Sequence, residues 1–407
     1  MESKFTAEFF TNNRLRLREL FTGTAPIVVS ANGLMQRNSD MAFPFRQDSS
    51  FWYLTGLELP NAVLVMDKDK EYLILSDTDD IHEFFNGSPQ QEKIKARSGI
   101  TDVFDGTAGW KKLDNRIKKV KHIATLAPPP AFAERFYFYT NPSRSALFTR
   151  IKEVNPNIEF LELRQQLTTM RMFKQPVELE SIQQSIDLTV KTFKSLKKRL
   201  SKMSHEYEVD AFITHEYRRN GAMNGYGPIV ASGSNAHTIH YESNNSALDQ
   251  NGLLLIDTGA EFEYYSADIT RTYSLKTPTK RQVAVFDAVH EAHLYGLDLV
   301  RQHKSIKENE QLMEQFIGEK LRALGLIKSI ERETVRKYYP HGLSHFLGLD
   351  LHDIGDYDRP LEPGMVLTVE PGIYIPEEGI GVRIEDDVLV TPKGIKVLSS
   401  KLPRELW

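Results

Sequence analysis

The sequence predicts a protein of two domains, an α/β N-terminal domain followed by an α+β C-terminal domain. The chain has 407 residues, which is more than one hydrophobic core of ordinary size accommodates. Short β-rich runs alternate with helical stretches in the first part, whereas strands, two helices and further strands follow one another in the second. A strongly amphipathic segment begins at Pro176. We therefore place the boundary at about 170–176 and expect domains of residues 1–172 and 173–407.

The first domain is expected to contain a mixed or parallel sheet covered by helices. Polar helical stretches at about 80–98 and 110–119 separate some of the β-rich runs, and this alternation is typical of an α/β layer. The predicted strands are 26–31, 61–66, 71–75 and 122–126.

Two helices are expected at the start of the second domain. Pro176 suits the first turn of a helix, where its missing N–H is not needed, and Glu178 favours the same end. Apolar residues then recur at steps of three and four from Ile182 to Leu200. A second helix at about 205–219 ends at Asn220–Gly221, a suitable C-terminal cap.

The rest of the second domain predicts helices on one face of an antiparallel sheet. Helices are expected at about 279–302 and 308–324 because apolar residues recur there with helical spacing. The predicted strands lie within 227–233, 252–260, 264–275, 364–375 and 380–391.

Composition and charge exclude several classes of protein. The net charge is −4 and the pI about 6.3, so neither nucleic acid nor an anionic membrane is an expected partner. There is no cysteine, which rules out disulfides, thiolate metal ligands and a thiol nucleophile. The N-terminal residues contain no apolar signal region and no window approaches eighteen apolar residues, so we expect a cytoplasmic protein.

Two aspartates in a predicted hairpin are the first candidates for chemistry. If the turn is centred near Phe262–Glu263, Asp257 and Asp268 lie directly opposite each other, and their neighbours are apolar. Like charges that face each other across a strand pair are destabilising, and buried carboxylates need partners. A divalent cation between them would remove both objections. The alternative is that one aspartate points outward or caps a turn.

Two glutamates pose the same question near the C-terminus. Glu370 ends an apolar run before Pro371, and Glu385 lies in a strand-like segment with alternating apolar residues. We expect Arg383 to point to the face opposite Glu385. Glu385 is then either a metal ligand or the partner of some other Arg or Lys.

The run HGLSHFLGLDLHD contains three histidines among apolar residues. Pro340 and Gly342 argue against a helix that would present both His341 and His345 to one ion. We therefore expect His345 to be the metal ligand, with His341 and His352 nearby as supporting or substrate-contacting groups.

Other histidines are interpreted more simply. His240 lies on a predicted apolar β-run, and His237 is expected on the opposite, exposed face. The segment HEAH, from His290 to His293, resembles a zinc-protease motif, but that motif needs histidines four residues apart. Here they are three apart, so we expect them on a helix surface.

Two aspartates, two glutamates and one histidine make an oxygen-rich ligand set. This set suits Mn²⁺, Co²⁺ or Zn²⁺ in a paired site better than a structural zinc. Bridging carboxylates can hold two such ions roughly 3.5–4 Å apart.

The order of these residues resembles the metallopeptidases with the pita-bread fold. The segments DTGAEFEYYSADITRT, HGLSHFLGLDLHD, VLTVEPGIYI and GIGVRIEDD look like the proline-specific branch (M24B), which includes aminopeptidase P and prolidase. The segment FPFRQDSSFWYLTG is similar to the leading domain of aminopeptidase P. The resemblance covers nearly the whole chain. It implies an N-terminal domain of the creatinase/aminopeptidase P type and a C-terminal pita-bread domain.

The resemblance also implies a role for each candidate residue. Catalysis is assigned to His240, His352 and Glu370, with Glu370 as proton shuttle, and Thr270 sits beside the ligands. Substrate binding or support of the site is assigned to His341, Tyr374 and Arg383. The implied ligands of two divalent ions, with Mn²⁺ preferred over Co²⁺ or Zn²⁺, are Asp257, Asp268, His345, Glu370 and Glu385, of which Asp268 and Glu385 bridge.

The implied reaction is removal of the first residue from peptides with proline second. A metal-bridging hydroxide attacks the Xaa–Pro bond, a tertiary amide whose nitrogen has no N–H for strand-like recognition. A prolidase, which cleaves Xaa–Pro dipeptides, is the alternative within the family. A catalytically inactive binding scaffold is the alternative outside it. The resemblance further implies that the first domain shapes the substrate channel and that the protein is a homodimer or homotetramer.

Overall fold

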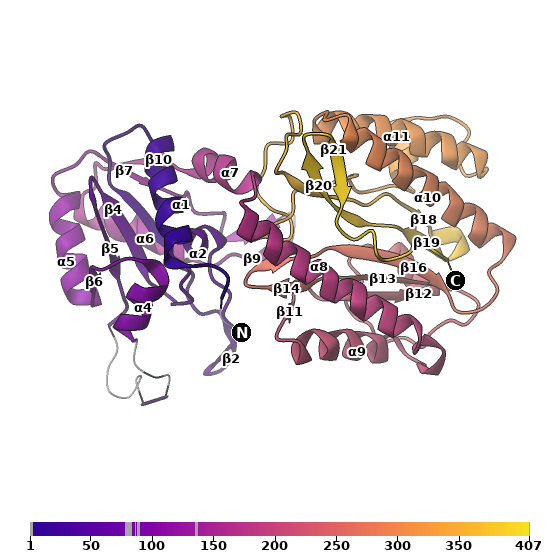
Figure 1. Cartoon of the computed structure of the whole chain (residues 1–407), viewed down its shortest axis with the longest axis horizontal. Coiled ribbons are helices and arrows are strands. Elements are labelled where there is room, and N and C mark those ends of the chain that lie inside the picture. Colours follow the sequence, from indigo (N-terminus) through magenta and orange to yellow (C-terminus); the bar gives the residue numbers. More distant parts are fainter. Residues whose placement is uncertain (1–2, 78–83, 86, 88–89, 135–136, 407) are drawn as a thin grey trace. The chain divides into compact units, whose positions relative to one another are not determined.

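The structure is a computed structural model that describes the chain except for residues 1–2, 78–83, 86, 88–89, 135–136 and 407. It divides into two compact units, Met1–Met170 and Arg171–Trp407 (Figure 1). The division falls inside helix α7 (Arg164–Met172). No helix among the described residues is both long and apolar enough to cross a membrane.

The first unit is built on a mixed six-stranded sheet with the order β10-β7-β1-β4-β5-β6. β4 is antiparallel to β1 and β5, whereas β1 with β7, β7 with β10, and β5 with β6 are parallel. The mixed sheet that the sequence predicted is therefore confirmed. The strands are β1 (Ile27–Ser30), β4 (Val63–Asp67), β5 (Lys70–Ile74), β6 (Val103–Phe104), β7 (His122–Thr125) and β10 (Glu159–Glu162).

The helices of the first unit differ in part from the prediction. Of the helix expected at 80–98, residues 91–98 form α4, and residues 80–83, 86 and 88–89 of that prediction lie outside the described residues. The helix expected at 110–119 begins earlier because Asp105 accepts a hydrogen bond from Ala108 N at 2.6 Å and caps it. The helices are α1 (Ala7–Leu20), α2 (Ser49–Thr55), α4 (Gln91–Ser98), α5 (Gly106–Ile117) and α6 (Ser143–Val154). Short strand pairs are β2 (Gln36–Asn38) with β3 (Met41–Ala42), and β8 (Phe132–Ala133) with β9 (Phe138–Tyr139).

Helices α5 and α6 pack on one face of this sheet. Leu113 and Ile117 of α5 and Leu147 and Ile151 of α6 share a core with alternate strand residues such as Val28. The residues that alternate with these are buried as well, so both faces of the sheet are covered. They include Val29, Leu64 and Leu73.

The helices of the second unit agree closely with the predicted ranges. Pro176 begins the first of them, α8, and Gln175 with Glu178 forms its capping box. The second, α9, is followed by Asn220 and by Gly221 at a φ of 78°. The helices are α8 (Pro176–Lys197), α9 (Glu206–Arg219), α10 (Lys280–Arg301), α11 (Ile306–Ala323) and the short α12 (Arg332–Arg336).

The strands of the second unit pair antiparallel, as expected, but in short separate sheets rather than one layer. The orders are β11-β14-β15, β12-β13-β16, β17-β20-β21 and β18-β19. Helix α8 packs against β14 and β15, α9 against β12, and α10 against β17, β18, β19 and β21. The strands are β11 (Met223–Asn224), β12 (Ile229–Ser232), β13 (Leu253–Thr258), β14 (Ala260–Phe262), β15 (Tyr265–Ser266), β16 (Ile269–Ser274), β17 (Val366–Val369), β18 (Gly372–Ile375), β19 (Ile380–Arg383), β20 (Asp386–Thr391) and β21 (Gly394–Val397).

The register of the β13–β16 hairpin differs from the prediction. Asp257 lies opposite Thr270, so the expected direct pairing of Asp257 with Asp268 is wrong. The turn residues are Glu263 and Tyr264, which both have positive φ, 46° and 72°. Two such residues form the tight turn that suits the twist of a hairpin. The turn centre therefore lies one residue later than expected, which moves every partner by two positions.

Candidate metal centre

The two aspartates still come together, through a tyrosine rather than through strand pairing. Asp257 is the penultimate residue of β13, Asp268 lies between β15 and β16, and both are buried. The hydroxyl of Tyr226 lies 2.7 Å from Asp268 Oδ1 and also hydrogen-bonds Asp257 Oδ1. Neither aspartate points outward, so the alternative interpretation, in which one of them does, is wrong.

His345 faces these carboxylates with its Nε2 atom. Its Nδ1 lies 3.0 Å from the carbonyl oxygen of Phe346, which can only accept, so Nδ1 carries the proton. Nε2 points at the carboxylates, 3.4 Å from Asp268 Oδ2 and 3.5 Å from Glu370 Oε1. Nε2 is therefore the atom that a metal ion would bind, in exchange for its proton.

The two glutamates complete the arrangement. Glu385 is 2% exposed, and its Oε2 accepts a hydrogen bond from Thr270 Oγ1 at 2.7 Å. Glu370 follows β17, and Thr368 Oγ1 lies 3.3 Å from its Oε1. Atoms of Asp268, His345 and Glu385 lie within 4.8 Å of one another, a group that could hold a metal ion.

Arg383 is not on the face opposite Glu385, as the sequence analysis expected. Residues two apart along extended backbone share a face, and Arg383 Nε lies 4.0 Å from Glu385 Oε2. Its Nη2 donates to Asp257 Oδ2, and its Nη1 donates to the hydroxyl of Tyr374 at 2.7 Å. That hydroxyl lies 2.8 Å from Nε2 of His341. A chain of hydrogen bonds thus joins Asp257 to His341.

The pKa values show a concentration of negative charge. Burial, together with Asp268, raises the pKa of Glu370 to about 7 against the lowering effect of His345 and Arg383. Burial, with the neighbouring carboxylates, raises the pKa of Glu385 well above its ordinary value. Burial lowers the pKa of His345, but Asp268 and Glu370 outweigh it and raise that pKa to about 9. Carboxylates so close together need positive charge between them, and a divalent cation fits.

His341 has the opposite electrostatic environment. Burial lowers its pKa to about 3, and Arg383, Arg336 and His240 add positive charge nearby. Its Nδ1 lies 3.8 Å from Glu370 Oε2. His341 is therefore a neutral imidazole at pH 7, next to the carboxylates but without the proton that an ion pair would need.

His352 and His240 are exposed, which suits groups that meet a substrate. The ring centre of His352 lies 4.2 Å from that of His345. His240 is not on a strand, as the sequence analysis expected, but in a turn after the 3₁₀ helix η3 (Gly233–His237). His237 ends this helix and is exposed, as predicted.

A buried glutamate holds the loop that carries His240. Glu206, at the start of α9, is 0% exposed and accepts four hydrogen bonds. Its Oε1 accepts from Ser232 N at 2.8 Å and from Asn235 Nδ2 at 2.9 Å. Its Oε2 accepts from Tyr241 OH at 2.8 Å and from Ser246 N at 2.9 Å. One carboxylate therefore ties the two ends of this loop together.

His293, the second histidine of the segment HEAH, lies in helix α10 but is not on the helix surface, so the expectation for this residue was wrong. His293 is 0% exposed, with its Nε2 3.1 Å from Asp386 Oδ2. Asp386 also accepts from Arg271 Nη2 at 2.8 Å and from Arg404 Nε at 2.6 Å. Burial alone would raise the pKa of Asp386, but Arg271, His293 and Arg404 together lower it well below its ordinary value.

Sequence reasoning missed two residues that support the centre. Tyr226 lies in the segment between β11 and β12, where no periodic pattern marks it. Asp387 is fully buried, and its Oδ2 accepts from the backbone N–H of Asp268 at 3.1 Å. The pair Asp386–Asp387 within an apolar strand was a signal that could have found the second.

An α/β unit, followed by an antiparallel unit with four buried or half-buried carboxylates around one imidazole, defines the class of protein. The protein has a site for a divalent metal ion, because oxygen ligands predominate in it.

Comparisons with known proteins give the family. Residues 180–392 match the model of Metallopeptidase family M24, and residues 10–124 match Aminopeptidase P, N-terminal domain. The chain belongs to metallopeptidase family M24, with the aminopeptidase P type of N-terminal domain and a C-terminal pita-bread domain.

Relatives and solved structures extend over almost the whole chain. An Xaa-Pro aminopeptidase of Haemophilus influenzae is 33% identical over 99% of this chain and 96% of its own length. An aminopeptidase of Pseudomonas aeruginosa has a similar structure, with a TM-score of 0.88, 28% identity, and coverage of 98% of this chain and 96% of that one. Aminopeptidase P from Escherichia coli has a similar structure with a TM-score of 0.86 and 28% identity, and the match covers 99% of this chain and 97% of that one.

Proposed function

We propose that the protein is an Xaa-Pro aminopeptidase, which removes the first residue from peptides with proline in second position. The observation that carries this proposal is the whole-chain similarity to Xaa-Pro aminopeptidases, together with the convergence of buried carboxylates on His345. Similarity over both units favours the same activity more strongly than a match to the catalytic unit alone would.

We further propose that two divalent ions, Mn²⁺ in preference to Co²⁺ or Zn²⁺, occupy the centre. The donor set supports a paired site, because four carboxylates carry more negative charge than one ion balances. When bound, such ions polarise a carbonyl and lower the pKa of water. The proposed ligands are Asp257, Asp268, His345, Glu370 and Glu385.

The chain's own residues would do the remaining work. Glu370 lies at the centre, with its Oε1 3.5 Å from His345 Nε2, and would accept a proton and return it to the leaving proline nitrogen. His240 and His352 are exposed, so they can contact the peptide, whereas His341 and Tyr374 orient it from within. Arg383 is 3% exposed and holds Asp257, which makes it a support of the ligand rather than a surface contact.

The test is hydrolysis of a series of Xaa–Pro and Xaa–Pro–Yaa peptides by metal-stripped protein to which Mn²⁺, Co²⁺ or Zn²⁺ is returned. We expect release of the first residue from the tripeptides, fastest with Mn²⁺. Cleavage of dipeptides alone would identify a prolidase instead. No cleavage of any peptide, with metal bound, would identify a binding scaffold. Full metal-dependent activity in an Asp268→Ala variant would contradict the assigned site.

The remaining roles follow from the same resemblance. We propose that residues 1–172 shape the substrate channel and mediate a homodimer or homotetramer, and that the enzyme works in the cytoplasm. Size measurement in solution, with and without these residues, tests the role in assembly.

A further inference from the structure

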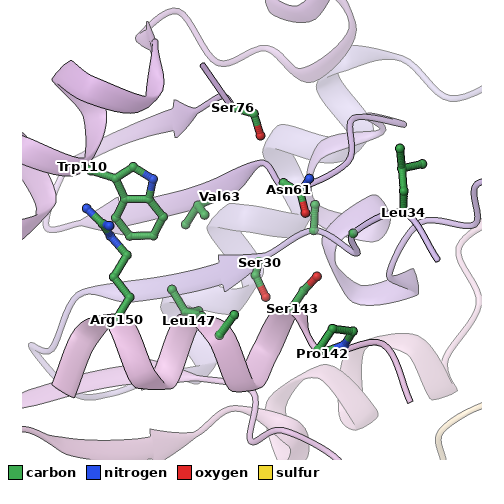
Figure 2. A pocket seen from close by; sticks show the side chains of 13 residues that line it. Ser30, Leu34, Asn61, Val63, Ser76, Trp110, Pro142, Ser143, Leu147 and Arg150 are labelled. Atoms are coloured by element: carbon green, nitrogen blue, oxygen red, sulfur yellow. The ribbon is translucent and has the colours of Figure 1, made fainter. Parts of the chain in front are cut away.

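We propose that the first unit binds a small organic anion in a pocket between its sheet and helices α5 and α6. The cavity has a volume of about 480 Å³ and is lined by thirteen residues, all from the unit Met1–Met170 (Figure 2). The proposed peptidase reaction uses none of them. Polar groups, an aromatic ring and one cation surround the space, which is the composition of a ligand site rather than of a packing defect.

The pocket lies where ligands commonly bind in α/β sheets. Ser30 and Ala31 lie at the carboxyl end of β1, and Ser76 follows β5. In this sheet β4, β5 and β6 follow one another on one side of β1, whereas β7 and β10 lie on its other side. Strand β1 is therefore the point at which the sheet stops growing in one direction and continues in the other. Open α/β sheets bind ligands at the carboxyl ends of strands beside such a change of direction.

One buried hydroxyl in this pocket lacks a partner. Ser30 is 8% exposed, and its Oγ has no hydrogen-bond partner among the residues that the structure describes. A buried polar group left unpaired is costly, so it marks a place where a further molecule is expected. Figure 2 shows Ser30, Ser143 and Asn61 with their polar atoms on the same side of the pocket.

A cation and an aromatic ring form the other side. The guanidinium of Arg150 lies 4.0 Å from the ring centre of Trp110, and Figure 2 shows the two side chains together. Arg150 Nη2 makes one long contact, 3.5 Å, with Asp114 Oδ2. Its Nε has no hydrogen-bond partner among the described residues. An arginine stacked in this way keeps N–H groups available for a planar anion.

The lining selects the sign of the ligand's charge. It contains one arginine and no acidic residue, so an anion gains a partner there and an ammonium group does not. Val63 and Leu147 supply apolar surface between the two polar sides. The ligand that fits is a carboxylate or phosphate group on an apolar body of about the size of an aromatic ring.

The test follows the indole N–H signal of Trp110 in the zinc-loaded full chain by nuclear magnetic resonance. The chain has three tryptophans, and a Trp110→Phe variant assigns the signal. Benzoate and phenyl phosphate are the anionic probes, and benzylamine and benzyl alcohol the controls. We expect a saturable shift with one or both anions and none with benzylamine. The anion that binds more tightly shows whether a carboxylate or a phosphate is preferred.

Variants show whether binding uses this pocket. We expect Arg150→Met to lower the affinity for the anion at least about tenfold, because a charge-assisted pair is lost. Ser30→Ala should lower this affinity about threefold. Arg150→Lys should retain part of the affinity. Arg164→Met, a change at an exposed arginine outside the lining, should change nothing. No saturable shift with either anion, or equal affinity in Arg150→Met, would overturn the proposal.

Discussion

The nitrogen that His345 offers to a metal is set by the hydrogen bond on the other side of its ring. Nδ1 donates to the Phe346 carbonyl, so Nε2 faces Asp268 and Glu370. His352 lies beside it but is exposed. Two neighbouring imidazoles therefore have different environments, which suggests different functions.

This difference predicts different effects of two substitutions. His345→Ala should lower the metal content of the purified protein, because a ligand is removed. His352→Ala should leave metal bound and lower kcat on Xaa–Pro–Yaa peptides by about tenfold or more, since we propose that His352 contacts the substrate. Elemental analysis and peptide hydrolysis measure the two quantities. Equal loss of metal in both variants would contradict the assignment.

Asp386 is a buried charge, and two of its three partners are buried as well. Arg271, His293 and Arg404 surround it, and Arg271 is 1% exposed. Asp386→Asn removes the negative charge and leaves the buried guanidinium of Arg271 without its carboxylate. We expect the free energy of unfolding to fall by about 3–5 kcal/mol, measured by chemical denaturation at pH 7.

A matched control comes from an exposed ion pair of the same unit. Asp187 contacts Lys401 at 3.3 Å, and both side chains are about half exposed or more. Asp187→Asn should change the free energy of unfolding by about 1 kcal/mol or less. Equal effects of the two substitutions would mean that the Asp386 cluster is not an important source of stability.

At the scale of elements, Glu206 connects helix α9 to the loop that carries His240. A glutamine at this position keeps one acceptor oxygen, but its NH₂ group faces donors that have lost their acceptor. Glu206→Gln should therefore loosen residues 235–246 and lower kcat about five- to tenfold with metal content unchanged. Faster amide exchange at 241–246 would accompany the loss.

Glu216 on the same helix is the control for this prediction. It is also largely buried, but its ion pair is with Arg219, which is exposed. Glu216→Gln should leave both kcat and the exchange of residues 241–246 unchanged. If the two variants behaved alike, the loss would reflect helix α9 in general and not the loop contacts of Glu206.

At the scale of the molecule, removal of metal should affect the second unit alone. The carboxylates of the centre repel one another when no cation lies between them, as the raised pKa of Glu385 shows. Chelation should therefore speed amide exchange in β13, β16 and β20. The sheet of the first unit, including β1, β4 and β5, has its own core and should not change. Added Mn²⁺ should reverse the effect.

Fast exchange throughout both units after chelation would contradict this prediction. It would mean that the metal stabilises the chain as a whole rather than the strands that carry its ligands. Mass spectrometry of peptic fragments, with and without chelator, resolves the two outcomes.

Much of the fold was predictable because its signals are local. The long helices α8, α9, α10 and α11 lie where the spacing of apolar residues placed them. The helix start at Pro176 and the helix end at Gly221 are determined by neighbouring residues, so sequence alone was sufficient. The buried carboxylates Asp257, Asp268 and Glu385 were recognisable because charged residues seldom occur within apolar strands.

The sequence by itself determined the aspartates, glutamates and histidine that the centre contains and the positions of the long helices. Only the tertiary structure decided their partners: Tyr226 between two aspartates, Arg383 beside Glu385, and the burial of His293 against Asp386. The physical reason is the range of the interactions. Propensity and periodicity act over a few residues. A one-residue change in the turn at Glu263–Tyr264, or a contact between distant segments, depends on the packing of the whole unit.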